Sequence, residues 1–357
     1  MPPGKTAKTA VQSVAGGGSG GIESLPDGVL EHILGFLPSP EAVRTCVLAR
    51  RWRHLWKSAT GLRVGCWDSA EPVSLEEPRS FVNHLLLLRG GAPLDTCYLK
   101  FYARPSSHDD ESHVNLSFRH LVMCKVWVLG LSLFGHSSGE PWLELSNLPL
   151  ISQHLVRLEL EGVQVHDSLL NLSSCPALEH LELYGCELSS VKKILSESLK
   201  HLSIMNLVCS SDSCIRICTP NLVWLRLEYL NRTPLLERMP SLLKAIIRIT
   251  MGCWDNCTNA NYETCHCESC DSSDSMANGN KNGVLLKGLS EAKSLALMSE
   301  PVMFIFKRDL RWCPMFTKLK TLLLDDYWCP PDGFHALACI LEHSPVLEKL
   351  TFQLGEQ

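Results

Sequence analysis

The sequence has 357 residues, a formal net charge of −5 and a pI near 6.3. This length can hold one small module and one large domain or repeat array. The nearly balanced charge gives no general attraction to nucleic acid or to an anionic membrane, and no stretch of about 18 uninterrupted apolar residues predicts a membrane span.

Residues 1–21 contain the glycine and serine run Gly16 to Gly21 and almost no large apolar side chains. Such a composition predicts a disordered tail rather than a transit peptide. The 17 cysteines are scattered, and the sequence has no signal-peptide start. Both features favour reduced, buried thiols over a secreted disulfide framework. We therefore expect an intracellular protein, in the nucleus or the cytoplasm.

Residues 22–61 carry the pattern of three short helices. An apolar stripe at helical spacing runs from Val29 to Leu37. Ser39 is placed to cap a second helix, with Pro40 at its first position. A third helix, rich in arginine and tryptophan, is predicted over Arg50 to Trp56. Since domains below about 40 residues rarely make a sufficient core, we expect part of this apolar surface to meet a partner.

Three stretches of this segment resemble the F-box family in order, spacing and residue type. They are Leu25-Pro26-Asp27, Ile33-Leu34-x-Phe36-Leu37 and the run from Thr45 to Trp56. The resemblance implies docking onto a Skp-type adaptor and, through it, onto a cullin ubiquitin ligase. The adaptor contacts that it implies are Leu25, Pro26, Ile33, Leu34, Leu37, Cys46, Val47 and Trp52. The alternative is an ordinary helical subdomain packed on the segments that follow.

A connecting helical segment is predicted over residues 62–92, with its helix near Phe81 to Leu88. From residue 93 to 357 the template Leu-x-x-Leu-x-Leu recurs. It starts at Leu155, Leu178, Leu199 and Leu222, more loosely at Leu242, and again at Leu319 and Leu347. The first five starts lie 20 to 23 residues apart, inside the leucine-rich-repeat range of about 20 to 29.

Each repeat supplies one short strand, and no repeat can bury its leucines without a neighbour. The predicted fold class is therefore α/β: a three-helix F-box followed by a leucine-rich-repeat solenoid with a curved parallel sheet. Weaker copies at Cys97, Val126 and Leu295 bring the expected total to eight to ten units.

The F-box-like start and the repeats together resemble the plant F-box/leucine-rich-repeat family, as do the stretches Leu289 to Ala292, Trp312 to Leu324 and His343 to Leu350. This resemblance implies the substrate-recognition subunit of an SCF-type (Skp-cullin-F-box) E3 ubiquitin ligase, non-catalytic and without a cofactor. Many members continue into an FBD-type segment, which is not found before Gln357, so we expect an incomplete distal cap. A repeat scaffold or decoy that acts without the ligase is one alternative.

A cysteine-rich insertion interrupts the repeats at about residues 250–284. Cys265, Cys267 and Cys270 offer soft ligands within one short loop, so they are candidate zinc ligands in a metal-responsive binder. The spacing is not a pair of Cys-x-x-Cys knuckles, and the flanking Asn, Ser and Asp are typical of a solvated loop. The preferred interpretation is a flexible insertion without a metal.

No catalytic motif is present: the sequence lacks a Gly-x-Ser-x-Gly elbow, a phosphate-binding loop and a His-Glu-x-x-His pair. Binding is instead expected on the concave face, where strand residues alternate with inward leucines. The candidates are Arg157, Glu159, Glu161, His180, Glu182, Tyr184, His201, Ser203, Met205, Trp224, Arg226 and Glu228. Their mixed charges predict a protein target rather than a nucleic acid. The alternative is that Trp224 packs over a neighbouring strand and binds nothing.

Overall fold

The structure is a computed structural model that describes residues 21–65, 76–102, 108–134, 142–209, 215–230, 233–250, 284–300, 306, 310, 313–328 and 335–353. Most of the predicted tail (residues 1–21) and the three candidate zinc ligands Cys265, Cys267 and Cys270 lie outside these residues. Within the described residues, no helix combines the length and the apolar character that crossing a membrane requires.

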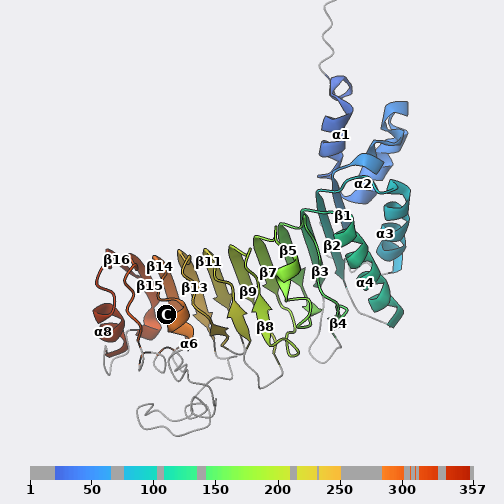
Figure 1. The fold of residues 1–357 in the computed structure, drawn as a ribbon. Coiled ribbons are helices and arrows are strands. Elements are labelled where there is room, and N and C mark those ends of the chain that lie inside the picture. The colour runs from blue at the N-terminus through green and yellow to red at the C-terminus, as the bar shows by residue number, and fades with distance from the viewer. Residues whose placement is uncertain are drawn as a thin grey trace, which may run out of the picture.

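One parallel sheet of eleven strands runs through the described part of the chain, and its strands neighbour one another in sequence order (Figure 1). The strands are β1 (Gly61–Gly65), β2 (Thr96–Tyr102), β3 (Val128–Phe134), β5 (Arg157–Glu161), β7 (His180–Tyr184), β9 (His201–Met205), β11 (Trp224–Glu228), β13 (Lys244–Ile249), β14 (Ser294–Ser299), β15 (Thr321–Asp325) and β16 (Lys349–Gln353). This confirms the predicted α/β repeat fold.

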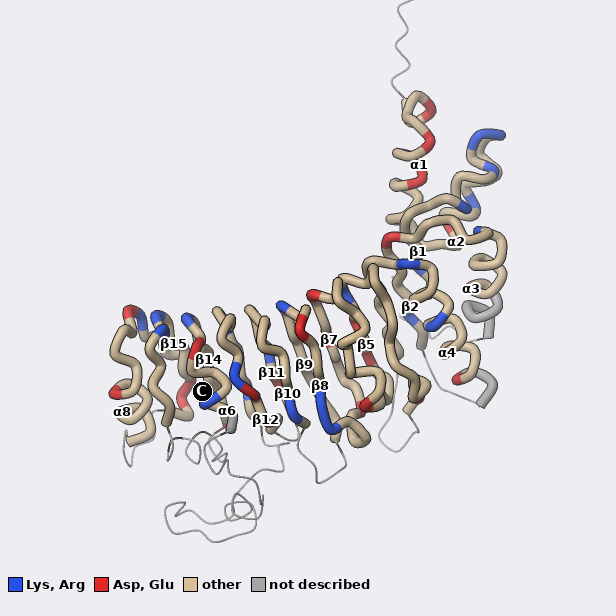
Figure 2. Tube along the Cα trace, viewed as in Figure 1, with Lys and Arg blue, Asp and Glu red and all other residues tan. Residues whose placement is uncertain are grey.

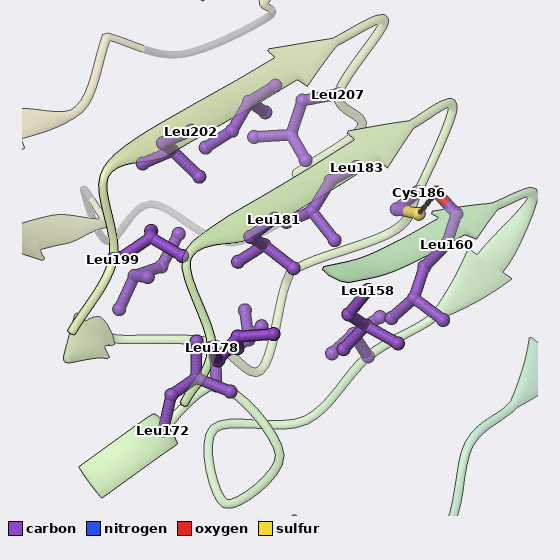
Figure 3. Packing of buried hydrophobic residues seen from close by; sticks show 14 of the residues in the cluster. Leu158, Leu160, Leu172, Leu178, Leu181, Leu183, Cys186, Leu199, Leu202 and Leu207 are labelled. Carbon is purple, nitrogen blue, oxygen red and sulfur yellow. Dashed lines mark hydrogen bonds between the residues drawn. The ribbon is translucent and has the colours of Figure 1, made fainter. Parts of the chain in front are cut away.

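The repeat leucines form the core in continuous rows across the strands. Leu158 lies opposite Leu181, which lies opposite Leu202, and all three side chains are fully buried. Figure 3 shows these leucines stacked from strand to strand on one side of the sheet. Because the side chains of a strand alternate between its faces, the residues between the leucines form the opposite face, which we call the open face.

The chain returns between strands in two ways. Helices cover the two ends of the sheet: α3 (Glu76–Arg89) and α4 (His108–Met123) at the β1 end, and α6 (Val284–Gly288) and α8 (His335–Glu342) toward the β16 end (Figure 1). The middle units return through short strands, which are β4 (Leu143–Glu144), β6 (Val163–Gln164), β8 (Lys193–Leu195), β10 (Arg216–Cys218) and β12 (Leu235–Leu236), with a 3-10 turn at η5 (Leu172–Ser174). These short strands pair in two small parallel sheets.

Free cysteines contribute to this core. The thiols of Cys175 and Cys186 are buried and donate hydrogen bonds to the carbonyls of Leu150 and Leu160. Burial raises the pKa of Cys186 to about 12, so its thiol is neutral and packs as a small apolar side chain.

The F-box segment begins with η1 (Ile22–Ser24), α1 (Asp27–Leu34) and α2 (Ser39–Arg44). The predicted third helix is absent as such: the chain forms 3-10 turns η2 (Thr45–Val47), η3 (Arg50–Arg53) and η4 (Leu55–Ser58) instead. Ser39 was also expected to cap α2, but Pro38 holds that position. The Ser39 hydroxyl instead accepts a hydrogen bond from the backbone N–H of Arg63 in β1, at 2.9 Å.

Two expectations about the repeat boundaries were wrong. The repeats were expected to begin at residue 93, but β1 pairs with β2 and opens the sheet before α3, which contains the helix predicted near Phe81 to Leu88. The described residues consequently contain one strand more than the upper limit of ten units. The sequence signal was weak there because Gly61–Gly65 has glycine at both ends and no Leu-x-x-Leu-x-Leu template.

Candidate functional site: the F-box surface and the open face

The F-box leaves large apolar side chains exposed. Among the eight predicted adaptor contacts, Pro26 and Val47 are exposed, and Val47 keeps 82% of its surface accessible. Four more are partly buried, namely Leu25, Ile33, Leu37 and Cys46. Leu34 and Trp52 were expected to be contacts, but they retain 1% and 4% of their surface because they form the core of the module.

Sequence reasoning missed the most exposed neighbours of these residues. Phe36 is 60% and Leu48 is 68% exposed, and Val29 and Ile22 also face solvent. Phe36 lies just beyond the end of α1, with its ring edge-on to His32 at 4.9 Å. Both Phe36 and Leu48 lie within the stretches that resemble the F-box family. Their exposure could have been predicted, because so small a module cannot bury all the apolar residues of these turns. We call Ile22, Pro26, Val29, Phe36, Val47 and Leu48 the F-box surface.

Arg51 links the two parts of the F-box surface, which are the residues at the start of α1 and those in the turns after α2. Its guanidinium donates hydrogen bonds to the carboxylate of Asp27 and to the backbone carbonyls of Glu23 and Leu25. Arg51 lies in η3, only a few residues after Val47. One side chain therefore fixes the start of α1 beside the turns that follow α2.

The open face carries three parallel columns of side chains, because all the strands pair in register. The first column contains Arg157, His180, His201, Trp224 and Lys244; the second contains Arg63, Tyr98, Gly130, Glu159, Glu182, Ser203, Arg226, Ile246, Ala296 and Leu323; the third contains Lys100, Ser132, Glu161, Tyr184, Met205, Glu228, Arg248, Met298 and Asp325. All twelve predicted target-face residues belong to these columns.

Charged and aromatic groups occupy the part of the open face nearest the F-box. Arg157 forms ion pairs with Glu159 and with Glu182, the latter at 2.6 Å on the neighbouring strand. The guanidinium of Arg63 lies 5.6 Å from the centre of the Tyr98 ring. Gly130 makes room for this ring, since a Cβ there would lie 2.5 Å from a ring carbon. Sequence reasoning did not predict Arg63, Tyr98 or Gly130, because their strands depart from the leucine template.

Three rings line up in the middle of the first column. The imidazoles of His180 and His201 stack with centroids 4.2 Å apart and planes within 5°. The ring of Trp224 follows at 6.3 Å from that of His201. Burial, followed by the neighbouring His201, lowers the pKa of His180. Stacked imidazoles beside a partly exposed tryptophan offer a flat contact surface.

Two predicted target-face residues are less accessible than alternation suggested. Glu228 is 7% and Ser203 is 4% exposed. The Glu228 carboxylate accepts a hydrogen bond from Arg226 at 3.0 Å, so its charge is already matched within the strand. Arg226, which keeps 37% of its side chain exposed, is the member of this pair that a partner can reach.

Apolar residues continue the second column toward the β16 end. Ile246, Ala296 and Leu323 stand opposite one another on β13, β14 and β15, and each is partly exposed. Their strands were predicted, but their part in the open face was not. The second column therefore changes from charged to apolar along the sheet.

A family model for the F-box domain matches residues 22–61. Among curated proteins, the chain is similar to three from Arabidopsis thaliana. F-box protein At5g03100 is 27% identical over 282 residues, which cover 71% of this chain and 83% of that protein. F-box/LRR-repeat protein At2g42720 is 25% identical, with 93% and 78% covered, and F-box/LRR-repeat protein At5g38396 is 25% identical, with 93% and 77% covered.

The F-box at one end of a leucine-rich parallel sheet defines an F-box protein of the repeat-bearing class. Relatives described as plant F-box/LRR-repeat proteins match the chain over most of its length, so the chain is similar to that family beyond the F-box itself.

Proposed function

We propose that this protein is the substrate-recognition subunit of an SCF-type E3 ubiquitin ligase. In this role the F-box docks onto a Skp-type adaptor, the open face captures a protein target, and the chain itself is non-catalytic. The observation that carries the proposal is the F-box surface, where Val47, Leu48 and Phe36 are each more than half exposed. Large apolar side chains gathered on one small module mark a protein-binding site.

The F-box surface is suited to binding because packed and hydrogen-bonded residues support it. Leu34 and Trp52 are buried beneath it, and Arg51 links its two parts. Pre-ordered apolar side chains lose little conformational entropy when a partner covers them. The charges also separate: Figure 2 shows acidic positions along α1 and basic positions on the turns beyond α2, where Arg50, Arg51 and Arg53 lie. This separation gives an adaptor a defined orientation.

The open face supports the second half of the proposal. Trp224 and Arg226 stand between the charged part and the apolar stretch of Ile246, Ala296 and Leu323. Tryptophan and arginine are the residues that most often concentrate binding energy in protein interfaces. Acidic and basic groups alternate over the face, whereas nucleic acid would require a basic stripe. A folded or extended protein segment therefore suits this face best.

Adaptor binding is tested by placing charge on the F-box surface. Val47→Glu with Leu48→Glu should abolish co-purification with a Skp-type adaptor, because two carboxylates would then be desolvated in the interface. The matched control is Leu116→Glu on α4, which is 67% exposed but lies outside the F-box. Both variants should keep the melting temperature of the parent. Undiminished adaptor capture by the Val47/Leu48 variant at equal expression would refute the docking half of the proposal.

Target capture is tested separately with Trp224→Ala and Arg226→Ala. Proximity labelling in the presence of a proteasome inhibitor should lose a defined set of proteins, while adaptor binding remains. Leu148→Ala is the control, since this exposed leucine precedes β5 and is outside the three columns. If the labelled set is unchanged, recognition lies elsewhere on the chain. Labelled proteins whose abundance does not respond to the inhibitor would favour the alternative, a scaffold or decoy.

A further inference from the structure

Two cysteines and a histidine meet at the β16 end of the array. Cys313 belongs to the segment before β15, Cys339 lies in α8, and His343 directly follows that helix. Their ligand atoms all lie within 4.8 Å of one another, and each residue is partly buried. Among the described residues, this is the one such group of three that could hold a metal ion.

Backbone contacts fix the two segments that carry these residues. The Phe316 N–H donates a hydrogen bond to the carbonyl of His343 at 2.8 Å. The His343 N–H donates to the carbonyl of Cys339, four residues earlier, at 3.2 Å. The Cys339 thiol points back to the carbonyl of Leu310. The three ligands are thus held by local structure and do not depend on flexible side chains finding one another.

One nitrogen of the His343 imidazole is engaged by the backbone, which leaves the other for a ligand. The Nδ1 atom lies 2.8 Å from the carbonyl oxygen of Cys339. A carbonyl can only accept, so Nδ1 carries the proton and Nε2 is left with the free electron pair. Metal-bound histidines commonly donate their second nitrogen to a backbone carbonyl in this way.

We propose that Cys313, Cys339 and His343 bind a zinc ion, with water in the fourth position. Two thiolates and an imidazole, with no carboxylate, select zinc over magnesium or calcium. In a tetrahedral site, zinc–sulfur bonds of about 2.3 Å place two sulfurs about 3.8 Å apart, which ligand atoms that already lie within 4.8 Å of one another can reach. Each thiol would release its proton to solvent as its sulfur binds the metal.

A zinc ion here would join α8 to the segment before β15. The β16 strand is less well buried than its neighbour there, because Leu350 and Phe352 are each 37% exposed while their counterparts in β15 are buried. The site is independent of the proposed ligase function and of the candidate ligands in the cysteine-rich insertion. Its role is to hold the β16 unit against the β15 unit, since each repeat is stabilised by contact with its neighbour.

The metal content of the full chain, purified with its adaptor, tests the proposal. Cys339→Ser and His343→Asn should each lower the zinc measured by mass spectrometry by about one ion per chain. The control is the triple variant of Cys265, Cys267 and Cys270 to Ser, which should retain this zinc. Unchanged zinc in both single variants, or loss in the triple variant alone, would overturn the assignment.

Thiol alkylation of the unaltered chain gives an answer even if a variant fails to fold. Zinc should protect Cys313 and Cys339 from alkylation, and a chelator should restore their reaction at least tenfold. Cys124, which is also a partly buried free cysteine, should react equally under both conditions. A Cys313–Cys339 disulfide, recognised by protection that a reductant but not a chelator removes, would contradict the proposal.

Discussion

Asp325 shows how a single carboxyl group makes stability depend on pH. It ends β15 on the open face, where burial raises its pKa to about 6, although the Ser299 N–H donates to it at 2.7 Å. Because the folded-state pKa lies above the unfolded one, the proton favours folding. This contribution is complete below about pH 4 and is lost as the pH rises through about 6.

Asp325→Asn should therefore stabilise the protein at pH 7.5, by on the order of 1 kcal/mol after allowance for solvent screening. The amide oxygen can still accept from Ser299, while the buried charge is gone. The advantage should shrink as the pH falls from 7 to 4, as followed by melting temperature. Asp326→Asn, at the exposed neighbouring position, should give a smaller change of the same sign, because the charge of Asp326 contributes to the raised pKa of Asp325. A stability difference that does not vary with pH would contradict this account.

At the residue scale, the sequence predicted on which face of the sheet a side chain lies, but not how far it is buried. Alternation correctly assigned Glu228 and Ser203 to the open face, since a strand has a period of two. Their burial depends on neighbours: Glu228 folds against Arg226, and Ser203 lies between Glu182 and Arg226 in its column. Such side-chain packing involves strands that are distant in sequence, so no local pattern reveals it.

At the scale of elements, the same position of the leucine template is buried to different extents in different strands, so it contributes differently to stability. Leu181 in β7 is fully buried between neighbouring strands, whereas Leu350 in β16 is 37% exposed. Leu181→Ala should cost roughly 2 to 5 kcal/mol and loosen the adjoining units, because it leaves a cavity. Leu350→Ala should cost less than half as much. Melting temperature and hydrogen exchange of β5 and β9 measure the difference, and equal losses would show that the β16 end is as well packed as the centre.

The elements that the sequence located were those with strong periodicity. Leucine rows from β5 to β11 follow the template, so their strands and inward residues were predicted correctly. The prediction of a third F-box helix was wrong because tertiary contacts hold the run Arg50–Arg53 in a 3-10 turn. They include the hydrogen bonds of Arg51 with Glu23 and Leu25. Helical propensity alone does not reveal that competition.

At the scale of the whole molecule, the sequence did not predict the contacts that join the F-box to the sheet. Ser39 accepts from the Arg63 N–H, and the buried guanidinium of Arg89 in α3 donates to the carbonyls of Trp56 and Pro93. The Ser39–Arg63 and Arg89–Trp56 bonds join residues 24 and 33 positions apart in the chain. They fix how the F-box surface is directed relative to the open face, which in the proposed ligase determines where a bound target is held.

The backbone approaches closely in this joint at Gly35, after α1, and Gly61, at the start of β1. A Cβ on Gly35 would lie 2.6 Å from the Gly61 nitrogen, and backbone atoms cannot move aside cheaply. Gly35→Ala should therefore push α1 away from the sheet, lowering the free energy of unfolding by about 1 to 3 kcal/mol. Gly28→Ala is the matched control within α1, since its added methyl meets nothing within 4 Å. It should stabilise the helix by up to about 1 kcal/mol. Chemical denaturation of the two variants measures both effects, and a Gly35→Ala protein as stable as the parent would mean that the F-box and the sheet are not coupled through this contact.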